Sequence, residues 1–329
     1  MNKASSIWIL AVLMLAASSF AHAQQTERVF RIGFLDSSTA SGGRPLADLF
    51  RQELQKLGWV EGKNFTMEFR FAEQKNERLA ELAAGLVVLK VDLIVVAGVP
   101  SGLAAKKATT IIPIVMTNSG DPVGAGLVAS LARPGGNVTG LSGLAAELIT
   151  KRLEILKDTI PKLVRVGLLQ PPGSSIGRDL QLNELRPAAV ALKLRLDEIE
   201  TQLDARGLEK AIQSANQKKS GAIMTTNATS FFAVRNQLVE LASKYRLPAI
   251  YFQKEFVEEG GLMSYGADLD DLYRHAAVYV DKILKGAKPA DLPVQQARKF
   301  EFIINLKAAK QIGLAIPPNV LARADRVIR

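Results

Sequence analysis

The sequence predicts an α/β protein of two facing lobes, each a parallel sheet with helices on both faces. Apolar runs of strand length alternate with helical segments, which is the pattern of βαβ units. The order of these segments begins again about 130 residues later. The chain has 329 residues, 48% of them hydrophobic and 22% charged, which is enough for about two globular domains.

The first set of segments spans residues 29–117. Residues 29–35 (VFRIGFL) are the first expected strand, because the run is apolar and rich in β-branched and aromatic residues. After a small-residue loop at 37–43 comes a helix that ends at Gly58, a residue that favours helix ends. The other expected segments are strands at 65–71, 92–97 and 112–117, a helix at 78–89 and a helix beginning in the loop 98–102.

The second set repeats this order. Residues 163–169 (LVRVGLL) have the pattern of the first strand, and 221–226 (GAIMTT) lead into the loop 227–230 and a helix over 231–245. Sequence identity between the two sets is slight, so the expected duplication is one of topology. The turn 133–137, with the segment 138–141 after it, is the expected first passage between the lobes.

Residues 1–23 are interpreted as a signal peptide. Lys3 precedes an uncharged apolar run from Ile7 to Ala17, and Ala21-His22-Ala23 has the small-x-small pattern of a cleavage site. The run is too short to span a bilayer, which takes about 20 residues. Cleavage after Ala23 would give an exported, unanchored periplasmic chain, and without cysteine it would not be lipidated.

Composition excludes several classes of function. The net charge is +10, but the basic residues are scattered rather than gathered in an arm with aromatic residues, so we expect no nucleic-acid partner. The absence of cysteine excludes disulfides, iron–sulfur clusters, cysteine-ligated zinc and thiol catalysis. One of the two histidines, His22, lies in the leader. We therefore expect no metal site and no cofactor.

Ligands of such folds bind where the carboxyl ends of parallel strands meet helix N-termini, whose free N–H groups favour anions. Five segments occupy such positions: 36–43, 98–102, 117–123, 170–177 and 227–230. They carry hydroxyls suited to holding a carboxylate. A single hydroxyl is better explained as a helix cap, and it is the convergence of several on one cleft that favours a ligand site. The candidates in these loops are Ser37, Ser38, Thr39, Gly98, Pro100, Ser101, Ser174, Ser175, Asn227 and Thr229.

Asp121 stands in the segment Ser119-Gly120-Asp121-Pro122-Val123, after an expected strand. Pro122 suits the first position of a helix, so Asp121 is either an N-cap or a carboxylate at the cleft mouth that accepts a ligand ammonium group.

Enzymatic interpretations have little support. The second histidine, His275, lies in a helical stretch where a structural role is expected, and the sequence has no P-loop, Gly-x-Ser-x-Gly elbow or Gly-x-Gly-x-x-Gly loop. The carboxylates near 258–259 and 268–271 lack calcium-loop spacing. We expect no enzyme.

Several segments resemble one family, the ABC-transporter substrate-binding proteins related to the tryptophan-binding TrpX group. The most specific is Ser130-Leu-Ala-Arg-Pro-Gly-Gly-Asn-Val-Thr-Gly140. The others are 57–64 (LGWVEGKN), 120–124 (GDPVG), 260–266 (GGLMSYG), 283–286 (ILKG) and 289–293 (PADLP). The resemblance extends from about Arg31 to Ala324.

The resemblance implies a type I periplasmic-binding-protein fold, with two Rossmann-like lobes joined by three hinge crossovers. The crossovers would lie near 137–143, 264–266 and 299–305. The lobes would comprise residues 24–140 with 266–300, and 141–265 with 301–329.

The resemblance also implies a ligand site between the lobes. Ser101 and nearby N–H groups would hold an α-carboxylate and Asp121, before Pro122, the α-amine. Asn227, where relatives often have Asp, would contribute from the second lobe. Phe34, Ser37 and Ser38 would line the first lobe, Tyr265 would lie near the hinge, and the loop with Ser174 and Ser175 departs from the Asn-rich form of the family.

The implied function is capture of a carboxylate-bearing solute, an apolar or aromatic amino acid, by a monomer that closes around it and delivers it to ABC permease subunits. The alternative is a sensory or accessory protein of the same fold that presents its closed state to a receptor. A secreted α/β hydrolase has little support, because this sequence lacks the nucleophile elbow that such an enzyme needs. A LacI-type regulator is excluded, because it would need a DNA-reading segment where the leader stands.

Overall fold

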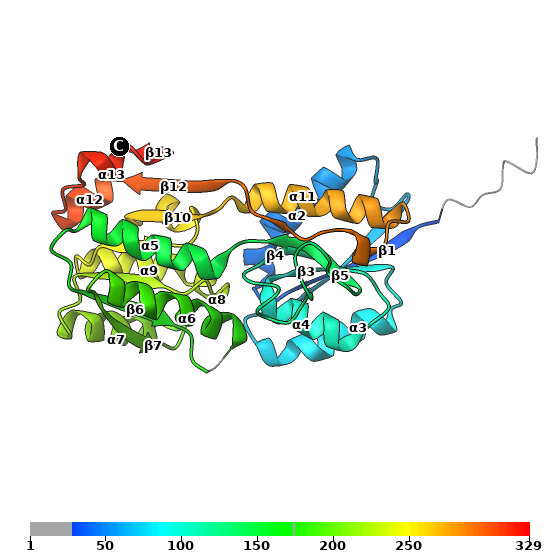
Figure 1. Cartoon of the computed structure of the whole chain (residues 1–329), viewed down its shortest axis with the longest axis horizontal. Helices are drawn as coiled ribbons and strands as arrows, with labels where there is room; N and C mark the ends of the chain where they lie inside the picture. The colour runs from blue at the N-terminus through cyan, green and yellow to red at the C-terminus, as the bar shows by residue number, and fades with distance from the viewer. Residues whose placement is uncertain (1–27, 174) are drawn as a thin grey trace, which may run out of the picture.

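The computed structural model describes residues 28–173 and 175–329, and shows two α/β lobes side by side (Figure 1). The interpreted signal peptide at 1–23 and Ser174 lie outside the described residues. Each lobe is built on its own sheet, and we name the lobes by these sheets: lobe 1 carries the six-stranded sheet and lobe 2 the seven-stranded sheet. The prediction of two mostly parallel sheets flanked by helices is confirmed.

The sheet of lobe 1 has the strand order β11-β5-β4-β3-β1-β2, and all its neighbouring strands are parallel. Its strands are β1 (Phe30–Asp36), β2 (Phe65–Phe71), β3 (Leu93–Ala97), β4 (Ile114–Ser119), β5 (Val138–Ser142) and β11 (Gln295–Gln296). β3 is buried along its whole length because helices cover both faces of the sheet.

Two helices cover each face of this sheet. α2 (Ala40–Lys56) and α11 (Leu269–Leu284) pack on one face around Phe50 and Val280. α3 (Leu79–Val88) and α4 (Gly98–Ala108) pack on the other around Leu86 and Ala105. The short helices η1 (Asn76–Arg78) and η2 (Pro289–Asp291) lie in connections.

The sheet of lobe 2 has the order β13-β12-β10-β9-β8-β6-β7. Its strands are β6 (Arg165–Gln170), β7 (Arg195–Glu200), β8 (Ala222–Thr225), β9 (Ala249–Tyr251), β10 (Met263–Ala267), β12 (Phe300–Asn305) and β13 (Arg326–Ile328). Only the β10–β12 pair is antiparallel among the paired strands of the described chain. The topology of 163–226 repeats that of 29–97, as the pattern predicts.

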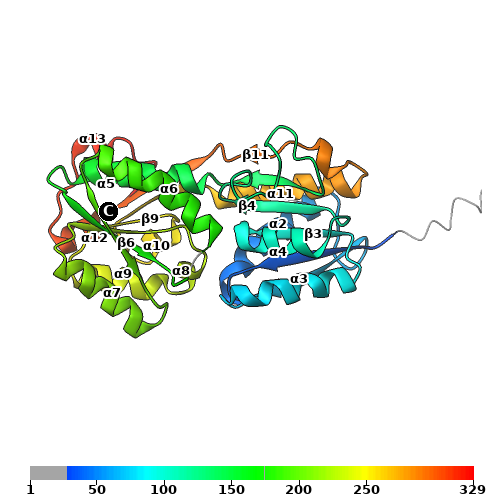
Figure 2. The same cartoon turned by 60° about the horizontal axis from the view of Figure 1, so that its bottom comes forward.

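Helices again cover both faces of the second sheet (Figure 2). One apolar cluster contains α5 (Ala145–Thr159), α6 (Ile176–Ala191), α12 (Leu306–Ile312) and α13 (Pro318–Leu321). The other contains α7 (Ala205–Gln217), α8 (Ser230–Ala233), α9 (Arg235–Lys244) and α10 (Glu255–Glu258). The single helix expected over 231–245 is divided at Val234 into α8 and α9.

The chain passes between the two sheets three times. β5 ends in the first sheet at Ser142, and α5 begins on the second sheet at Ala145. β10 of the second sheet is separated from α11 of lobe 1 by Asp268 alone. The last passage is residues 297–299, between β11 and β12.

The segment 37–43, expected as a loop, enters a helix at Ala40. Thr39 caps this helix, because its Oγ1 accepts a hydrogen bond from the N–H of Gly42 (3.1 Å). Gly43 lies so close to β1 and β2 that a Cβ there would stand 2.6 Å from Asp36 Oδ2 and 2.7 Å from Phe71. The small residues therefore allow the helix to begin against the strand ends.

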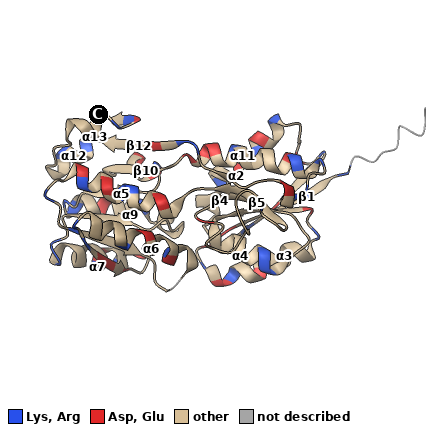
Figure 3. Cartoon of the chain, viewed as in Figure 1, with Lys and Arg blue, Asp and Glu red and all other residues tan. Residues whose placement is uncertain are grey.

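Charges of both signs are interspersed over both lobes (Figure 3). Within the described part of the chain, no helix combines the length and apolar character needed to cross a membrane.

Candidate ligand-binding site

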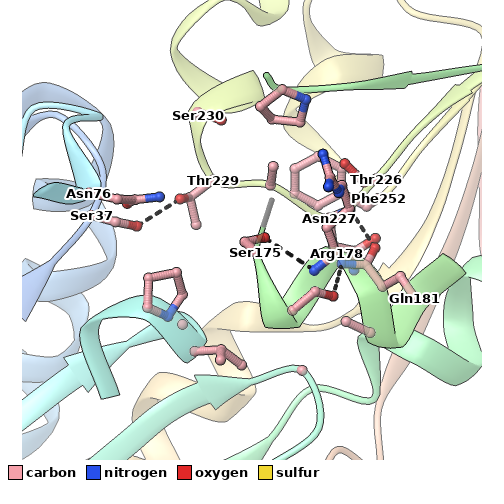
Figure 4. Close-up of a pocket in the computed structure, with 18 of the residues that line it drawn as sticks. Ser37, Asn76, Ser175, Arg178, Gln181, Thr226, Asn227, Thr229, Ser230 and Phe252 are labelled. Carbon is pink, nitrogen blue, oxygen red and sulfur yellow. Dashed lines mark hydrogen bonds between the residues drawn. The ribbon is translucent and has the colours of Figure 1, made fainter. Parts of the chain in front are cut away.

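A cleft of about 540 Å³ lies between the lobes, at the carboxyl ends of parallel strands from both sheets (Figure 4). Lobe 1 contributes the segments after β1, β2, β3 and β4, and lobe 2 contributes those after β6, β7, β8 and β9. Its volume is that of a small-molecule site. Seven of the candidates from the sequence line it: Ser37, Gly98, Pro100, Asp121, Ser175, Asn227 and Thr229.

The N-terminus of α4 forms part of the lobe 1 wall. Gly98 has a φ of +78°, and Ala97 at the N-cap has no side-chain oxygen to accept from the first turn. Val99 and Pro100 continue this wall. The first turn therefore presents backbone N–H groups that its own cap does not occupy.

Asp121 lines the same wall with one oxygen already in use. Its Oδ1 accepts the N–H groups of Val123 (3.1 Å) and Gly124 (2.9 Å), so this carboxylate does cap a turn. A Cβ at Gly124 would collide with Oδ2 of Asp121. The glycine keeps space beside the second oxygen. Capping therefore uses only one of the two carboxylate oxygens.

The lobe 2 wall is held in place by a series of hydrogen bonds that begins at the N-terminus of α6. Ser175 caps α6 by accepting from the N–H of Arg178 (3.3 Å). Gln181 donates to the carbonyl of Gly177 (3.0 Å) and accepts from the backbone N–H of Asn227 (2.7 Å). This fixes the loop after β8 against α6. Figure 4 shows Ser175, Arg178, Gln181 and Asn227 on this side of the cleft.

Arg152 is a residue that the sequence interpretation missed. It lies on α5, is fully buried, and donates from Nη1 to the carbonyl of Tyr265 (3.1 Å) and from Nη2 to Oδ1 of Asn227. Burial lowers the pKa of Arg152 to about 9, which leaves it cationic at neutral pH. A charged residue within the apolar face of α5, beside Ile149 and Leu153, was the available signal.

Six other candidates do not line the cleft, and Thr39, the N-cap of α2, is one of them. Phe34 is fully buried in the lobe 1 core against Phe50, Phe69 and Phe71. The N–H of Ser38 donates to Oδ1 of Asp36 (2.8 Å), and Ser101 is fully buried. Pro122 is buried, and the ring of Tyr265 stacks on Phe300. These side chains support the loops and strands on which the lining residues stand.

Several lining residues were not among the candidates. Lobe 1 adds Gln74, Asn76 and Glu77 from the segment around η1. Lobe 2 adds Arg178, Gln181, Gln202, Leu203, Thr226, Phe252 and Gln253. Asn76 and Glu77 follow β2 at the same sheet edge as Ser37, so the strand-end rule would have found them had it been applied to β2. Within the described residues, no cluster of three or more His, Cys, Asp or Glu could hold a metal ion.

Two α/β lobes that enclose a cleft lined from both sides define a two-lobed ligand-binding protein. The model of the ABC transporter substrate binding protein family matches residues 47–328. The chain belongs to this family, whose members bind solutes and are not enzymes.

Similar proteins support the same assignment. A curated "Tyrosine-binding protein" of Clostridioides difficile is 29% identical over 265 residues, which cover 80% of this chain and 75% of that protein. The crystal structure of a conserved domain protein from Vibrio cholerae is 29% identical, with a TM-score of 0.84 over 91% of this chain and 100% of that chain. The ABC domain from Streptococcus pneumoniae in complex with L-Trp is 27% identical, with a TM-score of 0.79 over 90% and 100%.

A fourth similarity concerns the arrangement of the lobes. The ligand-free, open structure of a substrate-binding protein with adhesive properties from Clostridium difficile is 26% identical, with a TM-score of 0.66 over 92% of this chain and 99% of that chain. The sequence identity of this open structure to the chain is nearly that of the L-Trp complex, but its TM-score is lower. The type I periplasmic-binding-protein fold is confirmed.

Proposed function

We propose that this protein is the periplasmic binding component of an ABC importer, and that it captures an apolar or aromatic amino acid in the interlobe cleft. The observation that carries the proposal is the composition of the cleft wall. Asp121 of lobe 1 and Asn227 of lobe 2 offer polar groups from opposite lobes. Apolar side chains line the same cleft, namely Val99, Leu148, Leu180, Leu203 and Phe252. An amino acid presents both kinds of surface.

The proposed mechanism is hinge closure. An open form admits the solute, rotation about the three interlobe segments encloses it, and the closed monomer docks on permease subunits. A ligand that touches both lobes binds the closed form better than the open form, which is the condition for a shift toward closure. Support comes from the contacts between lobes here and from the higher overlap with the L-Trp complex than with the open structure.

Export is part of the proposal, because a binding protein for an importer works outside the inner membrane. The leader at 1–23, with cleavage after Ala23 and no lipid anchor, would place the chain free in the periplasm. Asp121 would accept the ligand ammonium group through Oδ2.

A thermal-shift screen of the purified protein tests the ligand class. The set contains the twenty amino acids, aromatic acids and short-chain carboxylates. A ligand at 100 times its dissociation constant adds about 2.7 kcal/mol to the free energy of unfolding. We expect shifts with apolar or aromatic amino acids. Shifts only with acids that lack an amine would remove the role of Asp121, and no shift with any amino acid would contradict the proposed function.

A further inference from the structure

Arg152 is a buried cation without a counter-charge in the described chain. Its side chain is fully buried, and its two hydrogen-bonded partners are neutral, the carbonyl of Tyr265 and the amide of Asn227. Its Nε atom has no hydrogen-bond partner among residues 28–173 and 175–329. An unpaired charge in a protein interior is costly unless an opposite charge approaches it.

Arg152 stands directly behind the cleft wall. Leu148, one helical turn earlier on α5, lines the cleft, and so does Asn227, which accepts a hydrogen bond from Arg152. The guanidinium is therefore separated from the cleft by the amide group of Asn227.

The contact with Arg152 also fixes the orientation of the Asn227 amide. A guanidinium has only donors, so the atom of Asn227 that faces it must be Oδ1. The Nδ2 group then points the other way, and it has no acceptor in the part of the chain that the structure describes. Asn227 is half-buried and lines the cleft, so Nδ2 is a donor offered to a ligand.

Thr226 supplies a second unoccupied group at the same place. It lines the cleft next to Asn227, and its Oγ1 is buried with no partner among the described residues. Figure 4 shows Thr226 and Asn227 together at the lobe 2 side. A hydroxyl, an amide N–H and a cation behind them form an arrangement that a carboxylate satisfies, because it accepts from both donors and neutralises the charge.

We propose that the loop Thr226–Asn227 is the carboxylate subsite of the cleft, with Arg152 as the positioning residue that orients Asn227 and makes this wall electropositive. This rests on the proposed function and specifies its ligand: the carboxylate lies on lobe 2 and the ammonium group, opposite, on Asp121 of lobe 1. If the lobes close without an anion, the guanidinium of Arg152 is desolvated without a counter-charge. If they close around a carboxylate, the two charges pair. The charge of Arg152 therefore couples ligand binding to closure.

The test compares matched ligands by calorimetry. Four side chains are used, those of leucine, phenylalanine, tyrosine and tryptophan. For each side chain the probes are the L-amino acid, its carboxamide, and the carboxylic acid in which hydrogen replaces the α-amino group. The wild-type protein should bind carboxylates about 30-fold or more tightly than carboxamides, since hydrogen bonds to charged groups are the stronger ones. In Arg152→Met this preference should fall to about threefold, whereas Arg152→Lys should retain most of it.

Lys151→Met is the matched control. It removes one positive charge from the adjacent, exposed position of α5, and it should leave the preference for carboxylates unchanged. An equal loss in Lys151→Met and Arg152→Met would assign the effect to net charge and overturn the proposal.

Asn227→Asp keeps the test valid if Arg152→Met does not fold. An aspartate keeps an acceptor for Arg152, pairs its charge and removes the Nδ2 donors. We expect the melting temperature of the ligand-free protein to rise while affinity for carboxylates falls about 30-fold or more. Unchanged affinity for carboxylates would overturn the proposal.

The outcomes separate this inference from the proposed function. If amino acids and their carboxamides bind equally, the amino-acid function stands and the carboxylate subsite falls. If amine-free acids bind, amino acids do not, and binding depends on Arg152 and Asn227, the subsite stands and the amino-acid function falls. Binding of none of the probes contradicts both.

Discussion

The hydroxyl oxygens of Ser37 and Thr229 lie 2.9 Å apart, although 192 residues separate them in the sequence. Ser37 follows β1 in lobe 1, and Thr229 follows β8 in lobe 2, so this hydrogen bond spans the cleft (Figure 4). Leu180 of α6 also reaches across and packs on the lobe 1 core. These contacts exist only while the lobes are together, and they therefore stabilise this arrangement of the two lobes.

Removal of this hydrogen bond is expected to weaken ligand binding. Thr229→Val preserves the shape of the side chain but not its hydroxyl, and a net loss of about 1 kcal/mol corresponds to roughly a fivefold lower affinity. Calorimetry with the best amino-acid ligand measures the change. In the double variant with Ser37→Ala the two effects should not add, because both remove one interaction. Additive losses would show that each hydroxyl acts by itself.

Substitutions of Asp121 should separate its two roles. Asp121→Ala removes both the cap and the charge, so we expect lower stability and more than about tenfold weaker binding of an amino acid. Asp121→Asn keeps an acceptor for the N–H groups of Val123 and Gly124 but has no charge for an ammonium group. It should lose the affinity and keep the melting temperature of the ligand-free protein. Full affinity in Asp121→Asn would leave Asp121 with the cap alone.

Stability should depend on pH through Asp36, a fully buried carboxyl at the end of β1. Burial raises the pKa of Asp36 to about 6 in the folded protein from 3.8, despite hydrogen bonds from Ser38 and Ser37. Between pH 4 and 6 the unfolded chain has lost this proton and the folded chain retains it. The contribution of Asp36 to the free energy of unfolding therefore falls as pH rises through this window, by up to about 3 kcal/mol, and is constant above it.

Asp36→Asn removes this dependence. The variant should be more stable than the wild-type protein at pH 7.5 and equally stable near pH 3.5, as measured by denaturant titration at both pH values. A difference that is the same at both pH values would contradict the raised pKa of Asp36.

The lobes also approach at Gly177, in the first turn of α6. A Cβ there would stand 3.8 Å from the Cβ of Val99 in lobe 1. Gly177→Leu places a larger group in this interface, so we expect at least about tenfold weaker binding and a larger radius of gyration in the presence of ligand, measured by small-angle scattering. Gly85→Leu is the control, since Gly85 on α3 has open space around it. Equal behaviour of the two variants would exclude a specific effect on closure.

The main elements of the fold were predictable because strongly periodic or wholly apolar segments decide them. β1 and β3 lie within one residue of their expected bounds. β7 (RLDEIE) was not expected, since it is an edge strand with only two buried side chains and its stability comes from pairing with β6. β12 and β13 join the sheet through contacts distant in sequence, which local pattern does not report.

The site was predictable as a set of loops but less well as a set of side chains. Strand ends identify which backbone segments surround the cleft, and they led to Ser37, Asp121 and Asn227. They do not show which residues of a turn are exposed in the cleft, and Ser101 is fully buried. Arg152 reaches Asn227 from another element, 75 residues away, so only packing of α5 against the loop after β8 reveals it.

The connectivity sets an order of assembly. α11, which covers one face of the lobe 1 sheet, and β11, which completes its edge, follow nearly all of lobe 2 in the chain. The hydrophobic face of α2 that packs on α11 has no partner until residues 269–284 have been made. Lobe 1 therefore cannot fold as a unit from the N-terminus as synthesis proceeds. The core of lobe 1 therefore stays incomplete until most of the chain, lobe 2 strands included, has been made.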